Sequence, residues 1–336
     1  MKMTIQSMAD ELGVSKASVS FVLNGRAKEI GISDTSAKRI LEHCAKRNFA
    51  ININARRANS KLTRNVGLVV YGSYSNLPNP LAEPCAAIIA GGIASAAKES
   101  GFCVSLIVTN GEDELDTLLR RFQAKEVDGF ILSGFPLFDS WRSRFLRDGI
   151  PVVMIGENPA DGLPTVNIDN YEMSKALSSH IIEKHGRSKL GFLSGGPRSH
   201  VGNERKRGFL DAVAEHGLSA LFVEDCSFRE DFAHQRVKEL LRGDFACDAL
   251  ACANDSMAIG AARALLEAGV DIPGDLRLAG ADGSRDLNYF PAPIDSYSLL
   301  PHEQGAAAFE LFHSILENKT GERHMLLHSK LILREA

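Results

Sequence analysis

The 336-residue chain lacks the marks of several protein classes. It has no apolar run of membrane length and no N-terminal signal peptide, so we expect a cytoplasmic protein without a membrane partner. The six cysteines form no C-x-x-C pair and the ten histidines show no metal-ligand spacing, which argues against a metal site. No nucleophile–base–orienter set is present, so we predict neither a cofactor nor an enzyme activity. We expect Cys103, Cys247 and Cys252, which have apolar neighbours, to be small core residues in a reducing compartment.

The net charge of −4 conceals two oppositely charged regions. Residues 1–65 hold 12 Lys and Arg against 5 Asp and Glu, a charge of +7, whereas the remaining 271 residues hold 26 against 37, a charge of −11. A small basic region followed by a larger acidic region is typical of a nucleic-acid-binding module attached to a ligand-binding domain. A chain of this length predicts two or three domains.

Residues 4–24 predict two short amphipathic helices joined by a turn at Gly13. Thr4 and Ser15 are the expected N-caps, and Gly13 supplies the positive φ that a helix end often needs. Apolar residues recur at helical spacing in both segments: Ile5, Met8, Ala9 and Leu12 in the first, and Val19, Val22 and Leu23 in the second. The second helix begins with small and polar residues, which allows it to enter a major groove. The pattern predicts a helix-turn-helix, and a surface helical hairpin is the alternative.

The run from Gly13 to Gly25 resembles the helix-turn-helix of the LacI/GalR family of bacterial transcriptional regulators. That family's pattern is Gly-Val-Ser-x-x-[Thr/Ser]-Val-Ser-x-Val-Leu-Asn-Gly, and this chain has Ser18 where the family usually has Thr. The resemblance implies a sequence-specific DNA-binding protein, a repressor by family habit, that binds a pseudo-palindromic operator as a homodimer under the control of a small ligand. Lys16 and Ala17 are the expected base-reading residues. The other predicted DNA-binding residues are Thr4, Ser15, Ser18, Ser20, Asn24, Asn54, Arg56 and Ala58. The alternative is a ligand-binding protein of the periplasmic-binding class without a DNA function.

Residues 51–64 are polar and basic and predict a linker. The resemblance implies that this stretch forms a hinge helix only on DNA, where it enters the minor groove. Ala58 stands where the family has a leucine that pries open the central base step. Because alanine is too short to unstack a base step, we predict less DNA bending than is usual in the family.

From Asn65 onward, near-continuous apolar strands alternate with helical segments, which predicts doubly wound parallel sheets. The predicted strands are 66–71, 103–108, 129–132, 151–155, 189–193, 220–223, 249–252 and 276–280. Two such series predict two α/β lobes, and this arrangement resembles the periplasmic-binding-protein-like core of the same family. The fold class is therefore an all-α helix-turn-helix headpiece joined to an α/β core of two lobes. No heptad segment follows Leu331–Arg334, so we expect a dimer rather than a tetramer. The predicted bounds are 1–50 for the headpiece, 51–64 for the hinge and 65–336 for the core, with a first lobe at about 65–165 plus 295–322 and a second at about 166–292 plus 323–336.

Ligands of doubly wound lobes bind at the carboxyl ends of the strands. Polar residues that follow predicted strands are therefore the candidate effector contacts: Ser73, Asn79, Arg205, Asn254 and Asp282. A guanidinium fork can donate to two neighbouring oxygens, and a carboxylate can accept from two hydroxyls; the family resemblance implies that the effector is a sugar. The alternative for Arg205 is a solvated helix face shared with Lys206 and Arg207. We predict that Asp255 is the N-cap of a helix over 256–268, which leaves Asn254 for the ligand.

Overall fold

The structure, a computed structural model, describes residues 4–23, 25–49, 62–71, 81, 84–134, 138–158 and 162–334. The chain divides into two compact units, Met1–Thr63 and Arg64–Ala336. None of the helices in the described ranges is long and apolar enough to span a membrane. Residues 51–61 of the predicted hinge lie outside the described residues, as do six predicted contact residues: Asn24, Asn54, Arg56, Ala58, Ser73 and Asn79.

The first unit contains the predicted helix-turn-helix. Its elements are α1 (Ile5–Leu12), α2 (Lys16–Leu23), the 3-10 helix η1 (Ala27–Ile30) and α3 (Asp34–Lys46). Thr4 and Ser15 cap the first two helices as predicted, because their hydroxyls accept hydrogen bonds from the backbone N–H groups of Ser7 (3.1 Å) and Ser18 (3.0 Å). Gly13 ends α1 at φ 66°. The three α-helices share a small core of Met8, Ala9, Val19, Val22, Ile40 and Cys44.

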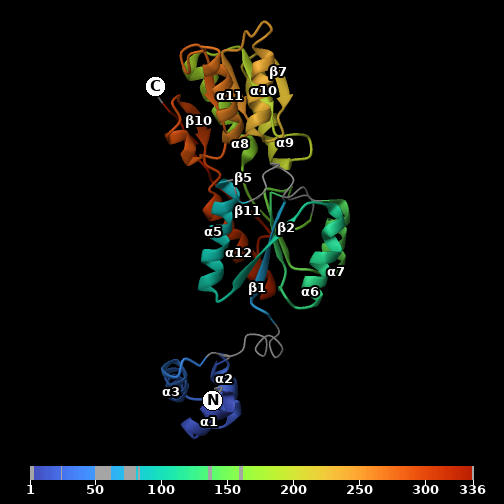
Figure 1. Ribbon diagram of the computed structural model, residues 1–336. Helices are drawn as coiled ribbons and strands as arrows, with labels where there is room; N and C mark the ends of the chain where they lie inside the picture. Colours follow the sequence, from blue (N-terminus) through green and yellow to red (C-terminus); the bar gives the residue numbers. More distant parts are fainter. Residues whose placement is uncertain are drawn as a thin grey trace. The chain divides into compact units, whose positions relative to one another are not determined.

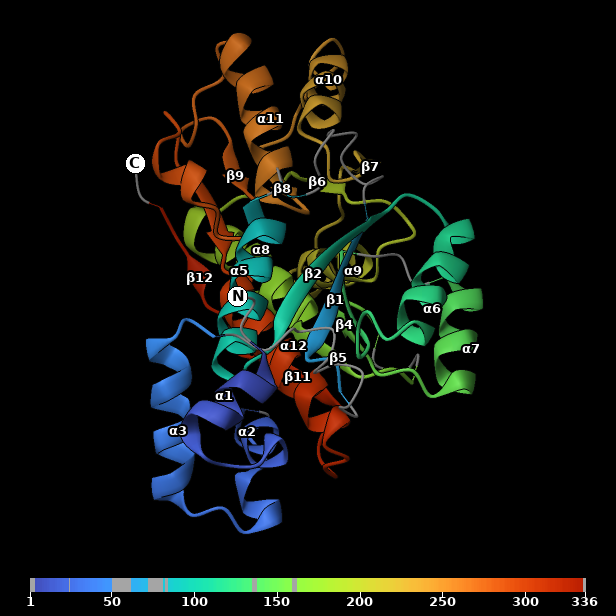
Figure 2. The ribbon, with the colours of Figure 1, turned by 60° about the horizontal axis from the view of Figure 1, so that its bottom comes forward.

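The first lobe of the second unit is a six-stranded parallel sheet in the order β11-β5-β4-β3-β1-β2. Helices α5 and α12 pack together on one face, and α6 and α7 cover the other (Figure 1, Figure 2). Gly92 and Gly305 allow α5 and α12 to approach closely, since a Cβ at either would lie 2.1 or 2.2 Å from a carbonyl oxygen of the other helix. The elements are β1 (Asn65–Tyr71), α5 (Pro84–Glu99), β2 (Cys103–Thr109), η3 (Glu112–Glu114), α6 (Leu115–Gln123), β3 (Phe130–Ser133), α7 (Asp139–Asp148), β4 (Val152–Ile155), β5 (Thr165–Ile168), α12 (Pro301–Leu316) and β11 (His324–Leu327).

The second lobe is a six-stranded sheet in the order β12-β10-β9-β8-β6-β7, parallel except for the antiparallel β12. Helix α8 packs on α9, and α10 packs on α11. The two lobes confirm the predicted fold class. The elements are α8 (Asn170–His185), β6 (Leu190–Ser194), α9 (His200–Glu215), β7 (Phe222–Asp225), α10 (Glu230–Leu240), β8 (Ala249–Cys252), α11 (Asp255–Glu267), β9 (Arg277–Ala279), η5 (Arg285–Asn288), β10 (Ile294–Tyr297) and β12 (Leu331–Ile332).

The chain crosses between the lobes three times, after β5, after β10 and after β11. The structure corrects the predicted lobe boundaries at each crossing. The first lobe runs on to Ile168, β10 lies in the second sheet although 295–322 is predicted for the first, and β11 lies in the first sheet although 323–336 is predicted for the second. The apolar pattern misses β5 and β10 because they are short and carry the buried polar residues Asn167 and Asp295. It misses β11 because this strand is short and none of its residues is fully buried.

The cysteines differ from the prediction at one position. Cys247 and Cys252 are buried, but Cys103 is exposed. Cys103 begins β2, which lies at the edge of the first sheet, so its apolar neighbours in the sequence do not enclose it. Burial raises the pKa of Cys247 to about 12, which keeps its thiol protonated and unreactive at neutral pH.

Candidate ligand site and DNA-binding surface

A cavity of about 220 Å³ lies between the two lobes at the carboxyl ends of their strands. Val70, Ser133 and Ile155, at the ends of three first-lobe strands, line one side. Three of the predicted effector residues, Arg205, Asn254 and Asp282, line the other side together.

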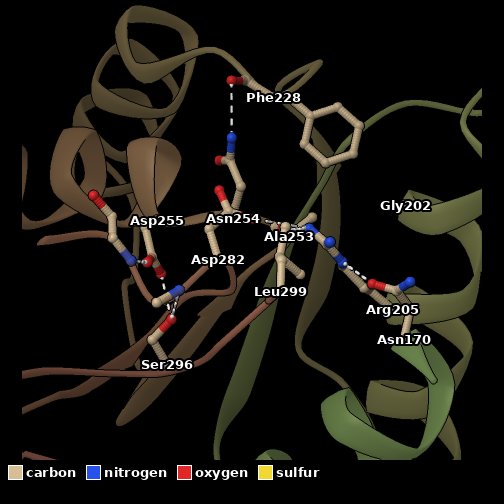
Figure 3. A network of polar contacts seen from close by, with 12 residues as sticks. Asn170, Gly202, Arg205, Phe228, Ala253, Asn254, Asp255, Asp282, Ser296 and Leu299 are labelled. Atoms are coloured by element: carbon tan, nitrogen blue, oxygen red, sulfur yellow. Dashed lines mark hydrogen bonds and ion pairs between the residues drawn. The ribbon is translucent and has the colours of Figure 1, made fainter. Parts of the chain in front are cut away.

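Arg205 is buried in the cavity wall and does not belong to a solvated helix face (Figure 3). Its Nε donates to Asn170 Oδ1 at 2.8 Å, and its Nη1 donates to the carbonyl oxygen of Ala253 at 2.5 Å. Nη1 also lies 3.5 Å from the Asp282 carboxylate. The Arg205 side chain is 5% exposed and the Asp282 side chain is 13% exposed. Within the described part of the chain, no acceptor hydrogen-bonds the second terminal nitrogen, Nη2. That nitrogen can donate to an oxygen of a bound ligand.

Asp282 has an unusual backbone, with φ at 126°, a region that L-residues rarely adopt. Main-chain hydrogen bonds on both sides hold it there. Its N–H donates to the carbonyl of Tyr297 at 3.0 Å, and its own carbonyl accepts from the N–H of Leu299 at 3.3 Å. Backbone outliers that the surrounding structure enforces are concentrated at ligand sites, and here the outlier carries the carboxylate that faces Arg205.

The structure corrects the predicted N-cap of α11, which is Asn254 and not Asp255. Asn254 is the N-cap of α11, because its Oδ1 accepts from the N–H of Met257 at 2.9 Å. Asp255 is the first residue of the helix and is buried, with its two carboxylate oxygens accepting from Ser284 N–H and Ser296 Oγ, each at 2.7 Å (Figure 3). Burial raises the pKa of Asp255 to about 7, against the opposing effect of these two hydrogen bonds. Either residue type can cap a helix, so adjacent Asn and Asp residues do not reveal which one does.

The first turn of α2 displays the predicted base-reading residues. Lys16 and Ala17 are exposed there. The hydroxyls of Ser15 and Ser18 lie 2.8 Å apart within the helix cap, which directs them toward the start of the helix. The remaining described candidates are exposed or half-buried: Thr4, Ser15, Ser18 and Ser20.

Comparison with known proteins identifies the family. Residues 69–335 match the family described as "Periplasmic binding proteins and sugar binding domain of LacI family". The chain belongs to the LacI family. It is a ligand-regulated, DNA-binding transcriptional regulator and not an enzyme.

Individual relatives agree with this assignment, and solved structures share the fold. The chain is 25% identical to the HTH-type transcriptional repressor PurR of Aliivibrio salmonicida, over 99% of this chain and 98% of that protein. It is 28% identical to catabolite control protein A of Streptococcus mutans, over 94% and 92%. The lac repressor dimer bound to operator and the anti-inducer ONPF has a TM-score of 0.84 at 19% identity, with 99% and 98% covered. The complex of the transcriptional regulator CelR with cellobiose has a TM-score of 0.75 at 24% identity, with 99% of both chains covered.

The cavity of this LacI-family chain also contains residues that sequence reasoning missed, notably Asn170, Phe228 and Gln304. Asn170 holds Arg205, and Phe228 adds an aromatic ring whose position depends on Gly195, since a Cβ there would lie 2.1 Å from the ring. None of the three belongs to a motif. The only sequence signal for Phe228 was the glycine pair Gly195-Gly196 after β6, because glycine in such a place allows another group to approach the backbone closely.

Proposed function

We propose that this protein represses transcription by binding a pseudo-palindromic operator as a homodimer, and that a sugar bound between the lobes controls its affinity for the operator. The observation that carries the proposal is the buried Arg205–Asp282 pair beside Asn254 in the interlobe cavity. PurR and catabolite control protein A support the regulatory part. Because its target is chromosomal DNA, we expect the protein in the cytoplasm.

A sugar suits the cavity because donors and acceptors lie side by side. Arg205 Nη2 can donate to a ring hydroxyl, and the Asp282 carboxylate can accept from neighbouring hydroxyls. Phe228 offers an aromatic surface for the C–H face of a sugar ring. CelR, a structural neighbour, was solved with cellobiose. A planar heterocycle that stacks on Phe228 and donates its N–H groups to Asp282 is the second candidate.

The headpiece supplies the DNA contacts in this proposal. Lys16 would donate to a guanine edge, and the methyl group of Ala17 would contact thymine. A change in the angle between the lobes on effector binding would alter the spacing of the two headpieces in the dimer. A coupling free energy of about 1–3 kcal/mol would change operator affinity by roughly 5- to 150-fold.

The proposal is tested by footprinting the purified protein on DNA from upstream of its own gene, with and without a panel of sugars and purine bases. We expect protection of two half-sites about one or more helical turns apart, and a shift by one member of the panel. A fragment with residues 1–63 removed should lose DNA binding and keep the ligand response, measured as a thermal shift. Specific DNA binding by that fragment would overturn the proposed role of the headpiece. Ligand binding with no specific DNA site under any condition would favour the alternative of a binding protein without a DNA function.

A homodimer requires a self-complementary surface, and the first lobe presents a candidate. Ile88 on α5 and Leu106 and Val108 on β2 are apolar and 41–48% exposed, and β2 is the edge strand of its sheet. Exposed apolar edge strands favour pairing with another chain. The lac repressor, which shares this fold, was solved as a dimer.

We therefore expect Leu106→Arg to convert the dimer to monomers and to weaken operator binding, because a monomer contacts only one of the two half-sites. Sedimentation velocity measures the oligomeric state. Leu326→Arg is the matched control, since Leu326 is 54% exposed on β11 at the opposite edge of the same sheet. An unchanged dimer in the Leu106 variant, or its loss in the Leu326 variant, would exclude this surface.

A further inference from the structure

Asp255 lies behind the cavity wall and contacts the turn that carries Asp282 (Figure 3). It is 1% exposed, and neither of its carboxylate oxygens is left without a donor. One oxygen accepts from the N–H of Ser284, two residues after Asp282, and the other accepts from the hydroxyl of Ser296 on β10. The close fit depends on Gly280, because a Cβ there would lie 2.3 Å from the Asp255 carboxylate.

The turn over residues 281–284 needs such support because its backbone is strained at Asp282. The φ of 126° at this residue is disfavoured, and Gly283 follows at φ 65°. On one side, Tyr297 and Leu299 hold Asp282 through main-chain hydrogen bonds. On the other side, Asp255 holds the turn through Ser284, and the Ser296 hydroxyl that donates to Asp255 also accepts from the N–H of Gly283 at 3.1 Å.

We propose that Asp255 is a positioning residue for the effector site: through Ser284 and Ser296 it holds the 281–284 turn in the conformation that directs the Asp282 carboxylate toward Arg205 and the cavity. This inference rests on the proposed function of the cavity as the effector site. The same contacts join the turn to β10, which leads into the second crossover between the lobes. A ligand that pulls on Asp282 therefore acts on a segment that is hydrogen-bonded to a crossover.

The ionised form of Asp255 is the form that accepts both hydrogen bonds. When the carboxylate is protonated, one oxygen becomes a donor and the Ser296 hydroxyl must turn away from it. Because burial raises the pKa of Asp255 to about 7, this change falls near neutral pH. The cations that act on Asp255 are Arg205 and Arg334, and Tyr297 is also within electrostatic reach.

Ionisation of Asp255 favours the hydrogen bonds of the turn but lowers the stability of the fold. The folded-state pKa of Asp255 is above its unfolded value, so the buried charge lowers the free energy of unfolding progressively as the pH rises from the unfolded pKa to about 7. Asp255→Asn removes that charge and keeps the shape of the side chain. If Asp255 only stabilised the fold, its replacement would lower the free energy of unfolding. If Asp255 is a positioning residue, its replacement leaves the second lobe at least as stable at about pH 8.

Hydrogen exchange of the full-length protein, measured by mass spectrometry without any ligand, tests the proposal. In Asp255→Asn at about pH 8, we expect the peptide over 281–299 to exchange roughly tenfold faster, as the loss of a hydrogen bond to a charged acceptor predicts. Peptides from β6 and β8 should be unchanged, and urea denaturation should show no loss of stability. After correction for the intrinsic rate, the protection of 281–299 in the unmodified protein should fall between about pH 8 and pH 6, and in the variant it should not change.

Asp128→Asn is the matched control, since Asp128 is a buried carboxylate in the first lobe that also accepts a backbone N–H, from Asn65 at 3.2 Å. It should leave the 281–299 peptide unchanged. Equal protection of this peptide in the Asp255 variant and the unmodified protein would overturn the proposal, as would a loss of protection spread over the whole second lobe. Neither result depends on a ligand, so failure here is distinguishable from failure of the proposed function.

Discussion

Replacement of Arg205 by Met should strongly weaken the response of the protein to its effector. The Met side chain keeps the apolar stem but removes the guanidinium that donates to the carbonyl of Ala253 and pairs with the Asp282 carboxylate. Loss of a hydrogen bond from a charged donor to the ligand costs about 1.5–3 kcal/mol of binding free energy. The ligand concentration needed for half-maximal release from, or recruitment to, the operator should therefore rise by roughly 10- to 150-fold. A fluorescence-anisotropy titration of a labelled operator, with and without ligand, measures this change.

The matched control for this prediction is Arg207→Met, on the same helix. Arg207 is 57% exposed, pairs with Glu204 at 2.7 Å and stacks over the ring of Tyr171. Its replacement should leave the ligand response within about twofold of the unmodified protein, since exposed pairs contribute little. Asp282→Asn, which keeps the shape of the second partner, separates binding from folding and should weaken the response with the fold intact. An unchanged response in the Arg205 variant would show that the effector binds elsewhere.

The apolar pattern predicted the eight strands that lie among apolar neighbours and missed four others. Those four are β5, β10, β11 and β12, and β10 shows why. Asp295 is completely buried in β10, but it is paired with Arg277 at 2.8 Å, a partner 18 residues away that no local pattern can supply. A buried ion pair makes a core strand resemble a surface segment in the sequence. The predicted lobe boundaries are wrong because the missed strands flank the crossovers.

The sequence likewise predicted some residues of the candidate site and missed others. The structure brings Arg205, Asn254 and Asp282 to one cavity, and their positions after predicted strands were enough to select them. Their contact with an effector stays a prediction. Asn170 and Phe228 were missed because they enter the cavity from a helix start and a loop without a motif. The burial of Asp255 behind the N-cap Asn254 could not be foreseen, because the hydrogen bonds that hold Asp255 come from Ser284 and Ser296, far along the chain. Long-range polar contacts are the part of this fold that its local sequence leaves open.

Replacement of Lys16 by Ala should remove most of the sequence specificity of operator binding. Lys16 is exposed on the first turn of α2, whose inner face is fixed by the buried Val19 and Val22. Lys16 is therefore held at the start of a helix whose rotation is fixed, with its side chain exposed to solvent. A side chain that donates to a base edge contributes about 1–3 kcal/mol of discrimination against the wrong base. We expect operator affinity to fall by roughly 5- to 150-fold, with binding to unrelated DNA reduced much less.

The slope of affinity against salt concentration separates base reading from a simple charge effect. Lys46→Ala is the matched control, since Lys46 is an exposed lysine at the end of α3. A lysine that contacts only phosphate weakens all sequences equally and lowers the salt slope by about one unit. If Lys16 reads a base, its variant loses the preference for the operator over a sequence changed at one base pair, and the Lys46 variant keeps that preference. Equal losses on operator and unrelated DNA in the Lys16 variant would assign Lys16 to the phosphate backbone and leave base recognition to Ala17 and its neighbours on α2.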